Sequence, residues 1–160
     1  CILAVNHRSN WDPVIAGLAC PRHLTFMAKE ELFKNPIFGK IISGLGAFPI
    51  RRGGGDVGAV KGAFKILNDG RVLLMFPEGH RMKNGKKGKA KPGAAMIAQR
   101  AKVPVVPMYI SGQYKWMHKI TVTIGNPISL EEYYGKRLDG VQLQELADGI
   151  LDNVWSYKAD

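Results

Sequence analysis

Residues 2–13 have the sequence ILAVNHRSNWDP. The run at 2–5 is short and apolar, which is typical of a buried strand. Asp12 followed by Pro13 is typical of a helix N-cap with proline at the first helical position. The stretch therefore predicts a strand, a polar loop and a helix in direct succession, which is the first unit of an α/β fold.

The rest of the chain continues this alternation of strand-like and helix-like segments. Pro104 and Pro107 in one of the strands indicate an edge, a bulge or strand ends. The pattern predicts a single α/β domain over residues 1–160, with a mixed, largely parallel sheet flanked by helices. Further strands are expected at 23–28, 47–50, 72–76, 103–110 and 119–124, and helices at 36–43, 56–67, 92–101 and 141–157.

Length and cysteine content limit the class of protein. The 160 residues suffice for one domain with a substantial core. Cys1 and Cys20 form no disulfide framework, which indicates a reducing, cytosolic setting. The chain enters its first strand at once and starts with cysteine rather than methionine, so we expect an N-terminal segment to be missing. No uncharged apolar stretch approaches the length of a membrane span.

Positive charge is concentrated in the middle of the chain, which carries a net charge of +10 overall. No acidic residue occurs between Glu78 and Glu131. Such a field attracts nucleic acid, an anionic membrane or a phosphorylated small molecule, although a solvated lysine-rich loop is the plainer interpretation of 83–91. The basic residues of the interval are Arg81, Lys83, Lys86, Lys87, Lys89, Lys91, Arg100, Lys102, Lys115 and Lys119.

His7 and Asp12 lie at the two ends of the first polar loop. A carboxylate in this place can hold a histidine in one tautomer and stabilise the imidazolium that forms when the ring accepts a proton. The pair is therefore a candidate general base with its orienting acid. Taken alone, the spacing also suits a loop histidine beside an N-capping aspartate.

Two more polar clusters follow predicted strands. Arg51 and Arg52 precede three glycines and a helix start, an arrangement suited to phosphate, although a solvated loop is the alternative. Glu78 and Arg81 follow the most apolar strand. They are candidates to bind a phosphate or hydroxyl group, and the alternative is a structural ion pair in a turn. Because functional loops gather at the carboxyl ends of parallel strands, we expect the three clusters to converge.

The residues in these clusters carry a family resemblance. The segments 6–12, 46–52, 76–81 and 103–107 resemble, in order, the motifs of the glycerolipid acyltransferases, beginning with His-x-x-x-x-Asp and including Phe-Pro-Glu-Gly-Thr-Arg. The resemblance covers residues 2 to about 110. It implies transfer of a fatty acyl group from acyl-CoA or acyl-ACP to the sn-2 hydroxyl of lysophosphatidate, giving phosphatidate, with no metal or cofactor.

The resemblance also implies roles for single residues. His7 is the general base and Asp12 orients it, while a nucleophilic Ser9 two residues from the histidine has poor geometry. Oxyanion donors are expected among the backbone amides near Gly79 or in the first loop. The implied substrate-binding residues are Ser9, Asn10, Arg51, Arg52, Glu78, Gly79, His80 and Arg81.

Departures from the family pattern leave the acceptor open. His80 replaces the usual threonine, and Met82 occupies a position where serine is common. Glycerol-3-phosphate or another lysophospholipid is therefore an alternative acceptor, and an inactive lipid-binding homologue or a basic nucleic-acid-binding module is more remote. Expected partners are the acyl thioester, acyl carrier protein and an anionic membrane. We expect the protein to bind the cytoplasmic side of this membrane, either peripherally or through the missing N-terminal segment. The aromatic and basic segment at 114–119 suits such an interface, although it is also typical of a connecting loop.

Overall fold

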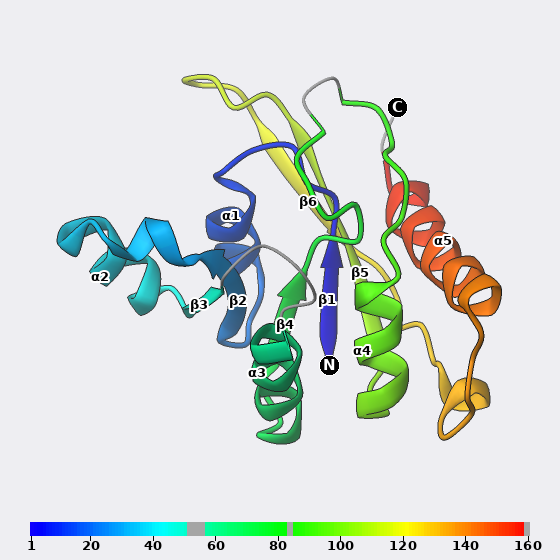
Figure 1. Ribbon diagram of the computed structural model, residues 1–160. Coiled ribbons are helices and arrows are strands. Elements are labelled where there is room, and N and C mark those ends of the chain that lie inside the picture. The colour runs from blue at the N-terminus through cyan, green and yellow to red at the C-terminus, as the bar shows by residue number, and fades with distance from the viewer. Residues whose placement is uncertain (51–56, 83–84, 159–160) are drawn as a thin grey trace.

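The computed structural model describes residues 1–50, 57–82 and 85–158. Within them, a six-stranded sheet lies between two groups of helices (Figure 1). The strands are β1 (Ile2–Val5), β2 (Leu24–Lys29), β3 (Ala47–Ile50), β4 (Val72–Met75), β5 (Val105–Gly112) and β6 (Ile120–Ile124). The helices are α1 (Asp12–Ala19), α2 (Pro36–Gly44), α3 (Val57–Asn68), α4 (Gly93–Ala101) and α5 (Gly140–Ser156), with short 3-10 helices at Glu30–Phe33 and Glu131–Tyr133.

The sheet has the strand order β3-β2-β4-β1-β5-β6. The first five strands in this order pair in parallel, and only β5 with β6 is antiparallel. This confirms the predicted mixed, largely parallel sheet. Because β1 is central, the loop that follows it has neighbours on both sides, from β4 and from β5.

The core has two layers because β1 is buried on both of its faces. Ile2 and Ala4 pack with α3, α4 and α5, whereas Leu3 and Val5 pack on the side of α1 and α2. Alternate strand residues point to opposite faces, so a central parallel strand is apolar throughout. This explains why the opening run of the chain shows no alternation of polar and apolar residues.

The prolines of β5 do not mark an edge strand, contrary to one of the predicted options. β5 lies between β1 and β6, and Pro104 precedes it. Pro107 lies just beyond the last pair of the β5–β6 ladder, which ends at Met108 and Ile124. A proline there has no N–H to donate to β6, so the ladder ends at this position, while its carbonyl still accepts the Gly125 N–H at 2.9 Å.

The predicted N-cap at Asp12 is also wrong. Trp11 occupies the cap position, and Asp12 is the first helical residue, 0% exposed. Its carboxylate turns back toward the preceding loop instead of toward the amides of α1. Asp56, the first residue of the helix predicted at 56–67, lies outside the described residues, as does the Arg51-Arg52 pair.

Candidate active site

The centre of the site is the pair predicted from the first loop. His7 Nδ1 lies 2.8 Å from Asp12 Oδ2, and the carboxylate has no exposure to solvent. Since a carboxylate accepts, Nδ1 carries the proton and Nε2 is left free to take one from a substrate. The His7 side chain is 15% exposed and the Asp12 side chain 0%, so the imidazole is the solvent-accessible member of the pair.

Asp12 is held by four donors. Its Oδ2 also accepts the N–H groups of Arg8 at 2.6 Å and Ser9 at 2.7 Å, and its Oδ1 accepts the hydroxyl of Tyr114. Burial alone would raise the pKa of Asp12, but these hydrogen bonds outweigh it and hold the pKa below its ordinary value. Asp12 is thus an anion at neutral pH, as an orienting acid must be.

The imidazole is fixed by stacking as well as by hydrogen bonding. The His7 ring lies on the Phe76 ring with centroids 3.8 Å apart and planes 16° from parallel. Phe76 directly follows β4, so the first and third predicted clusters do meet. The Met82 N–H, which donates to the His7 carbonyl at 2.7 Å, joins the same two loops.

Glu78 is buried next to the first loop, and its carboxylate accepts three hydrogen bonds from other parts of the protein. It is 0% exposed, and its Oε2 accepts the His7 N–H at 2.9 Å. Its Oε1 accepts the Gly88 N–H at 3.1 Å and Trp155 Nε1 at 3.2 Å. These contacts, and not a pair with Arg81, bind the carboxylate, and the substrate contact of Glu78 stays a prediction.

The end of β5 anchors the other side of the loop. The buried Asn6 exchanges two hydrogen bonds with the backbone of Ile110, donating at 3.0 Å and accepting at 2.7 Å. The Arg8 guanidinium donates to the Gly112 carbonyl at 3.0 Å. Arg8 therefore joins the first loop to the end of β5. Asn6 continues the contact between β1 and β5 beyond the last residue pair of their ladder.

Four other predicted residues lie at the rim. Asn10, His80 and Arg81 are exposed, as is Gly79. Gly79 has φ +71°, and a Cβ there would lie 2.9 Å from Lys91 Cγ, so the turn after β4 requires glycine. The side chains of Asn10, His80 and Arg81 are thus accessible to a ligand.

Several backbone amides expected as oxyanion donors are already engaged. The amides of His7, Arg8 and Ser9 donate to carboxylates, and the Gly79 N–H donates to the Phe76 carbonyl at 2.9 Å. The Ser9 hydroxyl accepts the Trp11 N–H at 3.2 Å. The amides of these four residues thus serve the loop structure.

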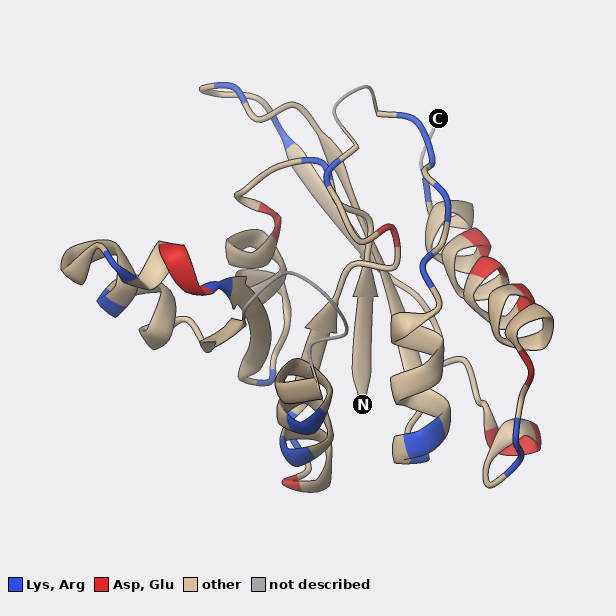
Figure 2. Cartoon of the chain, viewed as in Figure 1, with Lys and Arg blue, Asp and Glu red and all other residues tan. Residues whose placement is uncertain are grey.

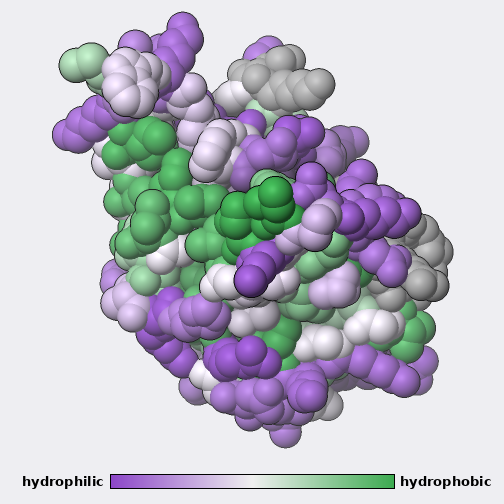
Figure 3. Space-filling view, turned by 90° about the vertical axis from the view of Figure 1, so that its left-hand side faces the viewer, coloured by the Kyte–Doolittle hydropathy of each residue, from purple (hydrophilic) through white to green (hydrophobic). Residues whose placement is uncertain are grey.

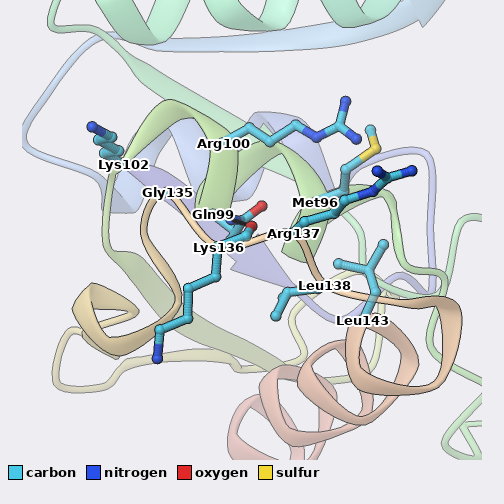
Figure 4. Close-up of a pocket in the computed structure, with 9 residues that line it drawn as sticks. All are labelled: Met96, Gln99, Arg100, Lys102, Gly135, Lys136, Arg137, Leu138 and Leu143. Carbon is cyan, nitrogen blue, oxygen red and sulfur yellow. Dashed lines mark hydrogen bonds between the residues drawn. The ribbon is translucent and has the colours of Figure 1, made fainter.

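Basic groups surround the site, and the hollow drawn in Figure 4 lies elsewhere. Figure 2 shows blue segments on the loops above the sheet, whereas red segments lie along α5.

The hollow, about 440 Å³, opens beside the carboxyl end of α4, at the opposite edge of the sheet (Figure 4). It is lined by Met96, Gln99, Arg100, Lys102, Gly135, Lys136, Arg137, Leu138 and Leu143, none of them a predicted site residue. Among the residues that the structure describes, no cluster of three or more metal-ligating side chains occurs.

The sequence that contains His7 and Asp12 matches a known family. A family model described as Acyltransferase matches residues 1–111, more than half of the chain. The chain belongs to the acyltransferase family. This confirms the resemblance drawn from the motifs, and the His–Asp pair at the centre of the site is typical of these acyltransferases.

Relatives of the chain are named as lysophosphatidate acyltransferases. It is 38% identical to the 1-acyl-sn-glycerol-3-phosphate acyltransferase of Streptococcus pneumoniae, over 88% of this chain and 54% of that protein. The Bacillus subtilis enzyme of the same name is 29% identical over 82% of this chain and 68% of its own length. The chain thus spans about half the length of the pneumococcal acyltransferase.

A solved structure agrees with the fold. The 1-acyl-sn-glycerophosphate acyltransferase PlsC of Thermotoga maritima superposes with a TM-score of 0.71 at 27% sequence identity. The superposition covers 99% of this chain and 68% of that one. The predicted fold class of this acyltransferase-family chain is therefore confirmed at the level of the whole domain.

Proposed function

We propose that this protein transfers a fatty acyl group from an acyl thioester to the sn-2 hydroxyl of lysophosphatidate, giving phosphatidate. The observation that carries the proposal is the buried His7–Asp12 pair with Nε2 of the ring free at the edge of the sheet. The printed names of the relatives support lysophosphatidate as the acceptor. Either coenzyme A or acyl carrier protein carries the donor.

In the proposed reaction, His7 Nε2 removes the acceptor hydroxyl proton while the oxygen attacks the thioester carbonyl carbon. Asp12 holds the ring and stabilises its cationic form. The tetrahedral intermediate then expels the thiolate as the C–S bond breaks, and the imidazolium returns its proton to the sulfur. No covalent acyl-enzyme, metal or cofactor takes part.

The test is direct identification of products. The purified protein is incubated with acyl-CoA or acyl-ACP and with lysophosphatidate, glycerol-3-phosphate or another lysophospholipid, and the products are identified by mass. Phosphatidate from lysophosphatidate is expected. Glycerol-3-phosphate as the preferred acceptor would replace the substrate assignment, and His80 is the residue that motivates its inclusion. Absence of acyl transfer to every acceptor would overturn the proposal.

The acceptor phosphate is proposed to bind Arg52 and Arg81, with Arg51 and His80 nearby in the sequence. Arg81 lies exposed at the rim of the site, two residues after Gly79. Arginine binds phosphate through bidentate hydrogen bonds. Arg81→Ala is therefore expected to raise the KM for the acceptor about tenfold or more, since hydrogen bonds to charged groups contribute strongly.

Steady-state kinetics with each substrate varied in turn checks this prediction. The donor KM of the Arg81→Ala variant is expected to stay near that of the unsubstituted protein. Arg100→Ala, an exposed arginine at the opposite edge of the sheet, is the matched control and is expected to change neither constant. An equal rise in both KM values for Arg81→Ala would remove the phosphate role.

Because the acceptor is a lipid, we propose that the protein binds an anionic membrane surface from the cytoplasmic side. The turn between β5 and β6 ends in Trp116 and Met117, each 91% exposed, and Lys115 and Lys119 flank them. Aromatic and basic side chains together suit the headgroup region. None of the described helices is long and apolar enough to cross a bilayer.

An apolar patch on α1 and α2 also supports binding to a membrane surface. Figure 3 shows a continuous green area on the side of the molecule that carries these helices. Figure 1 shows the β5–β6 turn extending above that side. Exposed apolar patches of this kind mark interaction surfaces. Its exposed members are Leu18, Ile37, Phe38, Ile41 and Leu45.

Binding to vesicles that contain anionic lipid is expected to fall with salt, since each basic residue near the surface contributes about 1 kcal/mol. Replacing Trp116 and Met117 by serine is expected to reduce the bound fraction at low and high salt alike, because the apolar contact is lost. Co-sedimentation measures both effects. Val141→Ser, exposed on α5, is the control. Failure of the unsubstituted protein to bind at low salt would contradict the proposal.

A further inference from the structure

Tyr114 gives the site a third side chain that the sequence motifs do not include. Its hydroxyl donates to Asp12 Oδ1, the oxygen that His7 does not use. Tyr114 follows β5 and is 102 residues from Asp12 in the chain. The three groups form a linear series in which the phenol, the carboxylate and the imidazole are each joined to the next.

The two oxygens of Asp12 have separate tasks because of this contact. Oδ2 serves His7 and the first loop, whereas the donor on Oδ1 is a side chain from the β5–β6 connection. Donors on both oxygens restrict rotation of the carboxylate about its Cβ–Cγ bond more than the three donors on Oδ2 would alone. The phenol therefore fixes the plane of the carboxylate, and with it the direction in which the imidazole ring points.

The phenol is suited to be a donor only. Burial raises the pKa of Tyr114, and the hydrogen bond to Asp12 and the charge of that carboxylate raise it further. Arg8 is the charged group that acts in the opposite sense. The hydroxyl thus stays protonated at any pH at which the reaction is expected to run, and it takes no proton from the series.

The position of the hydroxyl is set by the rest of the fold. Just before Tyr114, the chain is bound to the first loop at two places, where Asn6 pairs with Ile110 and where Arg8 reaches the Gly112 carbonyl. These contacts hold the end of β5 beside the loop. The phenol consequently approaches Asp12 from a supported segment and not from a free loop.

We propose that Tyr114 is a positioning residue, which holds Asp12 so that His7 presents Nε2 to the acceptor hydroxyl. The inference rests on the proposed acyl transfer and deepens it. Tyr114 touches no reacting atom and acts through Asp12. It also links the site to Trp116 and Met117, two and three residues further on, so the segment proposed to meet the lipid surface ends beside the catalytic pair.

Tyr114→Phe removes only the hydroxyl. Since hydrogen bonds to charged groups are among the strongest in proteins, kcat is expected to fall roughly 10- to 100-fold. Neither KM is expected to change appreciably, because the phenol contacts neither substrate. A second expectation is spectroscopic: the proton NMR signal of His7 Nδ1–H broadens through faster exchange with water, since its carboxylate partner is no longer held.

Tyr109→Phe is the matched control, because Tyr109 lies within β5, five residues before Tyr114, and packs edge-on against Trp155. It is expected to retain the kcat and the His7 signal of the unsubstituted protein. A Tyr114→Phe variant that keeps both an unchanged kcat and a sharp His7 signal would overturn the inference. Were the unsubstituted protein to transfer no acyl group, the proposed function would fail, and the NMR signal would still decide whether Tyr114 positions His7.

Discussion

His7→Ala is expected to lower turnover by roughly 10²–10⁴-fold, the usual contribution of general acid–base catalysis. The substitution removes the only group of the described site that combines a buried carboxylate partner with a free ring nitrogen. Binding of the acceptor is expected to persist, because its phosphate is proposed to bind Arg52 and Arg81. Product formation followed by mass measures the loss.

The variant is expected to stay folded, and this makes the result interpretable. His7 is partly exposed, and its side chain contacts mainly Asp12 and Phe76. Its backbone contacts with Glu78 and Met82 survive truncation. His23→Ala, at an exposed position before β2, is the control. Near-normal turnover of His7→Ala would remove the general-base assignment whatever the products are.

Glu78→Ala is expected to destabilise the protein by about 3 kcal/mol or more, since it leaves buried donors without an acceptor at about 1–3 kcal/mol each. The donors are the N–H groups of His7 and Gly88 and the indole nitrogen of Trp155. They come from three separate parts of the chain, so the loop after β1, the lysine-rich segment that contains Gly88 and α5 all lose a hydrogen-bond acceptor that they share. Chemical denaturation followed by circular dichroism measures the change.

Two further variants separate this effect from a loss of charge. Glu78→Gln keeps one carbonyl acceptor and is expected to fall between the alanine variant and the unsubstituted protein. Glu145→Ala, at an exposed position on α5, is expected to leave the unfolding free energy nearly unchanged. A Glu78→Ala variant as stable as the Glu145→Ala control would show that the carboxylate is not a structural anchor.

Much of the fold was predictable because its signals are local. A central parallel strand is apolar on both faces, so β1 and β4 stand out as short unbroken apolar runs. The polar segments that follow them had to meet, since parallel neighbours end at one edge of the sheet. The error at Asp12 has the same origin: an aspartate before a proline suits a cap, and only the position of His7 shows that its carboxylate turns the other way.

Contacts between distant segments could not be predicted from the motifs. Trp155 is 77 residues from Glu78, and no local pattern on α5 distinguishes its indole from an ordinary apolar contact. In the sequence, Tyr114 is one member of an aromatic and basic segment, and Asn6 is the neighbour of His7. A buried asparagine beside a candidate base was a usable signal, because buried polar groups require partners.

By itself, the sequence determined the α/β class, the His7–Asp12 pair and the acyltransferase family, because strand patterns and short motifs depend on neighbours in the chain. Only the tertiary structure decided that Glu78 is buried next to the first loop and that Tyr114 completes the series from phenol to imidazole. The physical reason is the distance along the chain over which each kind of signal acts. Periodicity and spacing act over a few residues, whereas the partner of a buried carboxylate is chosen by which strands and helices pack against it.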